Sequence, residues 1–208
     1  MKNTQDVRAH IKKSIPEISW IVDEKTREKI IDAYQMALEK STWETLEDVP
    51  HIFVGSEPRG DMLDHVRAVV QLCRESTRIM KSFGHQIDEQ LVLTGAILHD
   101  VGKIVEHAQR DGVKVANKRL RHPMLGAHIA LSCGFSDDVA HIIMRHSVEG
   151  DIPLPPRHGS GGRLANLRTT ECMIVANCDH LAAQVRKREW GEMSGSFPLL
   201  DPGVPFNS

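Results

Sequence analysis

Several ordinary signals are missing from this sequence. Its 208 residues include a single tyrosine, and aromatic side chains make up only 4% of them. No apolar run approaches the roughly 20 residues that span a bilayer, and the first residues lack the apolar core of a secretory signal. We therefore expect a cytoplasmic protein that has no membrane partner.

An excess of charge of one sign is also missing. The formal net charge is -2 and the pI is near 6.6, so the chain as a whole does not attract duplex nucleic acid or anionic membranes. Hydrophobic residues (40%) and charged residues (26%) are near the averages of globular proteins. A small anionic substrate, bound by a local basic patch, stays compatible with these numbers.

The four cysteines form no C-x-x-C pair, and three of them (Cys73, Cys133 and Cys172) lie in apolar-periodic segments. Buried free thiols are therefore expected rather than disulfides or a zinc knuckle. No segment shows the period-2 alternation of a β-strand either. What the chain does have is histidine, with twelve residues.

Apolar residues recur at three- and four-residue steps over most of the chain, which predicts an all-α fold. Segment 91–98 is apolar on nearly every side and should form a central helix. A capping-box pattern at Ser41–Glu44 predicts a short helix, followed by a linker over residues 50–60. Pro123 places His122 at the N-cap of another helix. The other expected helices span 3–15, 24–40, 61–83, 136–146 and a segment from Thr169.

Imidazoles and carboxylates recur at the apolar faces and ends of these helices. His146 follows Ile142 by four residues and Asp179 follows Val175 by four, so both should point inward. A buried carboxylate needs a cation, hydrogen-bond donors or a metal ion. Histidine and aspartate without cysteine suit iron, manganese, zinc or nickel in a catalytic site. The candidate ligands are His65, His99, Asp100, His122, His146 and Asp179.

A single inward histidine is more often a hydrogen-bonded core residue than a ligand. We therefore interpret seven further histidines as core or surface residues, namely His51, His85, His107, His128, His141, His158 and His180.

Five short motifs together resemble the HD superfamily of metal-dependent phosphohydrolases. They are Asp64-His65-Val66, Leu98-His99-Asp100-Val101-Gly102-Lys103, His122-Pro123 with Gly126, Arg145-His146-Ser147, and Asp179. The resemblance covers about residues 60–185 and implies a bundle of five or more helices. It implies one ion held by His65, His99, Asp100 and Asp179, with Asp100 bridging to a second ion held by His122 and His146. Iron or manganese is the first expectation, and zinc or nickel the second.

The chain is most similar to the subset with two additional histidines, which includes HD-GYP phosphodiesterases and di-iron oxygenases. It departs from HD-GYP proteins, because a single histidine followed by residues 147–151 stands where they carry paired histidines, and no Gly-Tyr-Pro follows. Cleavage of cyclic-di-GMP is therefore not expected. We expect a helical elaboration over residues 1–59, the HD domain over 60–188, and an extended tail over 189–208 that packs on the surface or on a neighbouring subunit of a homo-oligomer.

The expected reaction is hydrolysis of a small phosphorylated metabolite or nucleotide by metal-activated water. Asp100 and Lys103 are the candidate catalytic residues, and Lys103 is also either a phosphate contact or a helix-end lysine. Arg121, Arg157 and Arg163 are candidate phosphate contacts, the last two from a glycine-rich lid or, alternatively, as incidental surface charges. Two other functions stay open: a di-iron oxygenase with the same ligands, and a non-catalytic regulatory module that binds a ligand.

Overall fold

The computed structural model describes residues 4–54, 57–116, 119–147 and 167–190. Most of them are helical, which confirms the all-α fold class. The helices are α1 (Thr4–Ser14), α2 (Glu24–Glu39), α3 (Met62–Ser82), α4 (Glu89–Leu98), α5 (Lys103–Glu106), α6 (His122–Ser132), α7 (Asp137–Arg145) and α8 (Thr170–Glu189), with 3-10 helices η1 (Pro16–Trp20) and η2 (Leu46–Asp48).

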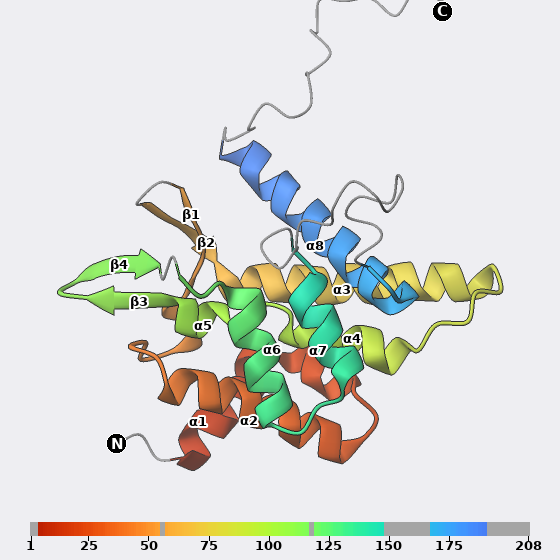
Figure 1. Ribbon diagram of the computed structural model, residues 1–208, viewed down its shortest axis with the longest axis horizontal. Coiled ribbons are helices and arrows are strands. Elements are labelled where there is room, and N and C mark those ends of the chain that lie inside the picture. The colour runs from red at the N-terminus through yellow and green to blue at the C-terminus, as the bar shows by residue number, and fades with distance from the viewer. Residues whose placement is uncertain (1–3, 55–56, 117–118, 148–166, 191–208) are drawn as a thin grey trace, which may run out of the picture.

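Helix α4 is the centre of the bundle. Residues 92–98 are all buried, and the helix packs against α3, α7 and α8 (Figure 1). Helix α3 presents a buried stripe that includes Val66, Val69 and Val70. A helix that is apolar on every side is stable only when other elements surround it. This packing carries the C-terminal end of α4, and the residues that follow it, into the interior.

The N-terminal helices α1 and α2 pack beneath this bundle in Figure 1 and share its core. Ile30 and Ile31 of α2 are fully buried. The hydroxyl of Tyr34, also fully buried, donates a hydrogen bond of 2.7 Å to the carbonyl oxygen of Ile97 on α4. Helix α2 therefore supports the last turn of α4, directly before His99.

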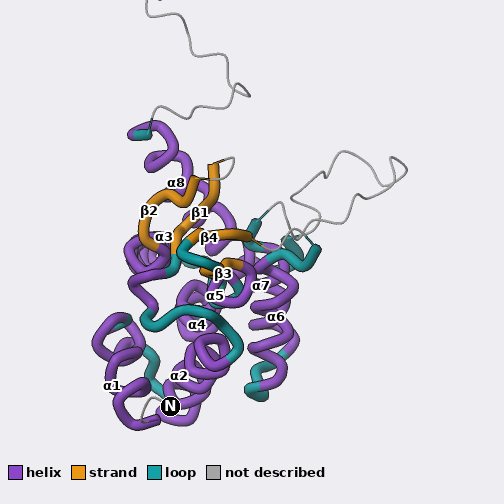
Figure 2. Tube along the Cα trace, turned by 90° about the vertical axis from the view of Figure 1, so that its left-hand side faces the viewer, coloured by secondary structure: helices purple, strands orange, loops and turns teal. Residues whose placement is uncertain are grey.

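Two antiparallel hairpins correct the expectation that the chain has no strands. Strands β1 (Pro50–Val54) and β2 (Glu57–Asp61) form where a linker was predicted, and β3 (His107–Arg110) pairs with β4 (Val113–Ala116). Both hairpins lie on the same side of the helices (Figures 1 and 2). The sequence did not reveal them because a short two-stranded ribbon need not bury one whole face, so alternation is weak. Asp111-Gly112, with φ of 50° and 77°, was a local hairpin signal for β3–β4, and the sequence pair Gly55-Ser56 was one for β1–β2.

Side-chain caps mark the starts of several helices. Asp61, Asp88 and Thr169 each accept hydrogen bonds from backbone amides in the first turn of α3, α4 and α8. The helix expected from Ser41 is wrong: η2 begins only after Thr45, whose amide donates to Asp48 at 3.2 Å. His122 is the first residue of α6 rather than its N-cap.

Cys73, Cys172 and Cys178 are buried free thiols and Cys133 is partly buried, as the spacing predicted. Among the described residues, no helix is both long and apolar enough to cross a membrane. The glycine-rich loop and nearly all of the predicted tail lie outside the described residues.

Candidate metal centre

The turn between α4 and α5 places Asp100 at the centre of the histidine cluster. His99 ends α4, Asp100 follows it, and both are fully buried. Gly102 lies against the start of α6, where a Cβ atom would be 2.0 Å from the His122 carbonyl oxygen and 2.6 Å from the Gly126 amide nitrogen. Only glycine permits this approach, which brings His122 next to Asp100.

One carboxylate oxygen of Asp100 faces two histidines and a lysine. Its Oδ2 atom lies 3.6 Å from His65 Nε2, 3.4 Å from His99 Nε2 and 2.7 Å from Lys103 Nζ. Asp179 Oδ1, on α8, lies 2.9 Å from His65 Nε2 and 3.8 Å from His99 Nε2. The ligand atoms of His65, His99 and Asp179 all lie within 4.8 Å of one another, so one ion could bind all three.

The other oxygen of Asp100 faces the remaining two predicted ligands. Its Oδ1 atom lies 3.4 Å from His122 Nε2 and 3.6 Å from His146 Nε2, and the two Nε2 atoms are 3.2 Å apart. His99, Asp100 and His146 form a further group with ligand atoms within 4.8 Å of one another. Asp100 therefore lies between two pairs of histidines, with one oxygen directed toward each pair.

Hydrogen bonds on the far side of the rings direct Nε2 atoms toward this centre. His99 and His146 each donate Nδ1–H to the carbonyl oxygen three residues earlier, at 2.6 and 2.7 Å. A carbonyl only accepts, so Nδ1 carries the proton and Nε2 of the neutral ring has the free lone pair. His122 Nδ1 lies 3.0 Å from Glu106 Oε2. Such bonds fix the orientation of histidines that bind metals.

The buried polar atoms of the cluster fit a metal ion. Apart from the ion pair with Lys103, both oxygens of Asp100 lack a hydrogen-bond partner in the described part of the chain, as does His99 Nε2. Burying such groups without compensation is costly. Imidazoles and carboxylates, with no thiolate among them, are ligands for a divalent transition-metal ion.

Electrostatic interactions keep the two aspartates ionised. Burial opposes ionisation of Asp100, but the positive charge of Lys103, 2.7 Å away, holds its pKa well below the usual range. Burial also opposes ionisation of Asp179, and its hydrogen bond with His65 lowers the pKa. Burial lowers the pKa of His65 as well. Ionised carboxylates beside a neutral imidazole are the protonation states that bind metals.

The comparison with known families agrees with this geometry. Residues 62–184 match the family model of the HD domain. The chain belongs to the HD domain family. The matched region begins at α3 and ends within α8, so all six predicted metal ligands lie in the HD domain.

Two proteins illustrate the similarity. An uncharacterised protein of Methanocaldococcus jannaschii is 26% identical over 144 residues, which cover 66% of this chain and 75% of that protein. Ribonuclease Y of Acidothermus cellulolyticus is 38% identical over 63 residues, which cover 30% of this chain but 11% of that protein. No solved structure matches the chain.

The predicted phosphate contacts are only partly placed. Lys103 lies beside Asp100, and its side chain is 7% exposed. Arg121 is the N-cap residue of α6, and its side chain is 45% exposed. Arg157 and Arg163 lie outside the described residues.

Glu106, on α5 of the HD domain, was missed in the sequence. Its carboxylate accepts from the backbone amide of His122 at 2.5 Å and from Arg121 Nε at 2.7 Å, in addition to the contact with His122 Nδ1. Burial opposes its ionisation, but the hydrogen bond from His122 lowers its pKa. A lone glutamate in a short helix has no periodic signal, so only the folded chain shows this role.

His51, which precedes the HD domain, was interpreted as a core or surface residue. It lies on β1, is 2% exposed, and its ring stacks on that of His65 with centroids 3.8 Å apart and planes 21° apart. The ligand atoms of His51, His65 and Asp100 lie within 4.8 Å of one another. The sequence could not connect His51 with the cluster, because the hairpin that carries it was not predicted.

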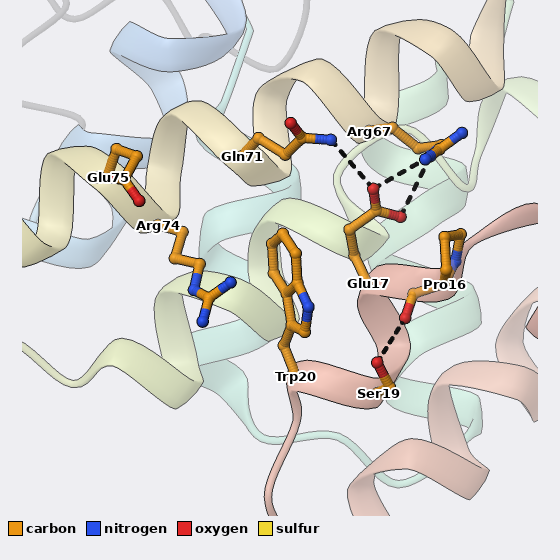
Figure 3. Close-up of a pocket in the computed structure, with 8 residues that line it drawn as sticks. All are labelled: Pro16, Glu17, Ser19, Trp20, Arg67, Gln71, Arg74 and Glu75. Atoms are coloured by element: carbon orange, nitrogen blue, oxygen red, sulfur yellow. Dashed lines mark hydrogen bonds and ion pairs between the residues drawn. The ribbon is translucent and has the colours of Figure 1, made fainter.

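A hollow of about 510 Å³ lies between η1 and α3, and no histidine of the cluster lines it. Figure 3 shows Arg67 and Gln71 pointing toward Glu17, whose Oε1 atom accepts from them at 3.0 and 3.2 Å. The Arg74 guanidinium lies 4.2 Å from the centre of the Trp20 ring. These side chains already satisfy one another, so the hollow is a weaker candidate than the cluster around Asp100.

Proposed function

We propose that the chain is a metal-dependent phosphohydrolase that acts on a small phosphorylated metabolite or nucleotide. HD domains are typical of enzymes of this class. The observation that carries the proposal is the position of Asp100, with one oxygen toward His65 and His99 and the other toward His122 and His146.

The cluster divides naturally into two positions for divalent ions. His65, His99, Asp100 and Asp179 would hold one ion, and His122 and His146 would hold the second together with Asp100. Iron or manganese is proposed first, with zinc or nickel as alternatives. When bound, such ions acidify a water molecule and neutralise phosphoryl oxygens.

The protein side chains hold and orient the charges around these positions. Asp100 presents an oxygen to each position and is kept ionised by Lys103. We propose that the Lys103 ammonium, 2.7 Å from Asp100, also contacts a phosphate oxygen of the substrate. Arg121 would add a bidentate contact from the edge of the cluster, and Arg157 and Arg163 are proposed to do the same.

A small substrate is favoured over a nucleic acid. The net charge of -2 provides no general attraction to a polyanion. Ribonuclease Y, by its name, acts on RNA, and the similarity to it covers only 11% of that protein. What this relative supports is therefore the phosphoester as the reacting group, rather than RNA as the substrate.

The test combines metal content with two activities. Protein purified without chelators should contain metal and hydrolyse a member of a panel of nucleotides, cyclic nucleotides and simple phosphoesters. Asp100→Ala should lose both metal and hydrolysis, because Asp100 serves both ion positions. Oxygen uptake without hydrolysis would contradict the proposal and support a di-iron oxygenase. Metal-free protein with neither activity would contradict it in favour of a regulatory module.

A further inference from the structure

His51 is enclosed next to the metal centre although it comes from outside the HD domain. The β1–β2 hairpin, which carries His51, packs against Trp190, the residue that follows α8. A Cβ atom on Gly60 of this hairpin would lie 2.9 Å from the Trp190 ring and 3.4 Å from His51 Cβ. The rings of His51 and Trp190 have centroids 6.5 Å apart. Hairpin and α8 thus cover the side of His65 on which His51 stacks.

One nitrogen of the His51 ring has no polar partner among the described residues. Its Nδ1 atom is buried and has no hydrogen-bond partner within residues 4–54, 57–116, 119–147 and 167–190. The contrast is with His107 of β3, also buried, whose Nδ1 donates to the carbonyl oxygen of Pro50 at 3.0 Å. Native proteins rarely leave a buried ring nitrogen unpaired without a structural or chemical reason.

The cluster itself offers the missing partner. A nitrogen of His51 lies within 4.8 Å of ligand atoms of both His65 and Asp100. A single ion can span this spacing once the His51 ring turns out of its stack on His65 and directs an in-plane lone pair toward the ion.

We propose that His51 is a further ligand of the ion held by His65, His99, Asp100 and Asp179, and that it ties the β1–β2 hairpin to the metal centre. This inference rests on the proposed metal centre. It adds to that centre an imidazole from an element that the HD domain does not include. Stacking alone is the competing explanation, because an aromatic ring in place of His51 could orient His65 without binding metal.

Two substitutions separate these explanations. His51→Phe keeps a ring that can stack on His65 but has no nitrogen, whereas His51→Ala removes both. His107→Gln serves as a control at a buried histidine outside the cluster. The readout is the affinity of metal-free protein for Co²⁺, measured by competition with a chromophoric chelator, together with the visible absorption of bound Co²⁺. Circular dichroism establishes that each variant is folded.

We expect His51→Phe and His51→Ala to weaken Co²⁺ binding equally, by about tenfold or more, and to change the visible band, while His107→Gln matches wild type. If His51→Phe binds as wild type does, His51 is at most a stacking residue and the inference is wrong. If wild type binds no Co²⁺, the proposed metal centre fails as well.

A measurement on the unaltered protein covers the case in which the variants do not fold. With ¹⁵N-labelled histidine and added Zn²⁺, NMR should show metal-bound ring nitrogens from His51 in addition to those from His65, His99, His122 and His146. Signals from those four alone would overturn the inference while leaving the proposed function intact.

Discussion

At the scale of single residues, the candidate site depends on groups that hold each histidine ring in place. The carboxylate of Glu106 binds both the backbone amide and the Nδ1 atom of His122, and it also binds Arg121. Glu106 is 2% exposed, so water cannot readily replace these hydrogen bonds. The orientation of His122 toward Asp100 therefore depends on a residue that touches neither proposed ion.

Glu106→Gln should weaken the second ion position selectively. The amide has the size of the carboxylate but lacks its charge and one acceptor oxygen, so it cannot make the same three contacts. Loss of such an orienting group typically costs about 10- to 100-fold in metal affinity. Equilibrium dialysis with Mn²⁺ should show this loss for one ion per chain, whereas exposed Glu75→Gln should be neutral. Unchanged affinity in Glu106→Gln would contradict the assigned role.

The lowered pKa of His107 predicts that the stability of the fold depends on pH. Burial lowers its pKa from 6.5 to about 4. Because the folded pKa is lower than the unfolded one, the stabilisation is present above about pH 6.5 and is lost as the pH falls toward 4. At about 1.4 kcal/mol per pKa unit the loss is about 3 kcal/mol. Urea unfolding of metal-free protein should show a flatter pH profile for His107→Gln.

Other buried histidines contribute slope in the same direction, so the His107→Gln profile should flatten without becoming level. The partly exposed His141 provides a control, because His141→Gln removes a histidine whose pKa is lowered by less extensive burial. Identical profiles for wild type and His107→Gln would show that His107 is not held neutral in the fold.

At the scale of elements, the site is built where the turn after α4 meets the first turn of α6. Gly102→Ala should force the two apart, because the added Cβ would lie 2.0 Å from a backbone oxygen and 2.6 Å from a backbone nitrogen, neither of which can move alone. Overpacking of this kind costs about 1 to 3 kcal/mol or more. The free energy of unfolding, measured with denaturant, and the metal content should both fall.

Gly84→Ala is the matched control for Gly102→Ala. Gly84 has φ of +90° with open space around it, so alanine there carries only backbone strain of about 1 to 2 kcal/mol. Gly84 follows the last turn of α3, far along the chain from every predicted ligand, and its substitution should leave metal content unchanged. Equal effects on metal content from both substitutions would contradict the role given to the close approach at Gly102.

The sequence revealed those elements whose signals are local. Helices α3 and α8 were predictable because apolar residues recur along them at helical spacing, and α4 because a run that is apolar on every side is stable only in the interior. The predicted ligands lie on or beside such helices, and the structure brings all six together. The hairpins were not predictable from alternation, and His51 was missed with them because its position depends on tertiary packing.

At the scale of the whole molecule, the cluster joins segments that are far apart in the chain. His65 is on α3, His146 follows α7 and Asp179 is on α8, so an ion held by the cluster links most of the bundle. Metal that binds the folded chain alone stabilises it by about 2.7 kcal/mol at a concentration 100 times its Kd. Mn²⁺ should therefore raise the Tm, and a chelator should reverse the increase.

Asp100→Ala is the variant that tests this stabilisation, since it should remove the response of the Tm to Mn²⁺. His128→Ala, at an exposed histidine of α6, should retain it. A Tm that responds equally in wild type and in Asp100→Ala would mean that Mn²⁺ acts outside the cluster.

The most direct test of a two-ion centre bridged by Asp100 is elemental analysis of metal per chain, with phosphoesterase activity measured on the same samples. Wild type should hold two ions and Asp100→Ala none, because both positions use that carboxylate. His146→Ala should hold one ion and have reduced activity, since His146 serves only the second position and charge stabilisation is shared between two ions. If His146→Ala keeps full metal content and full activity, His146 is a core histidine and the two-ion centre is wrong.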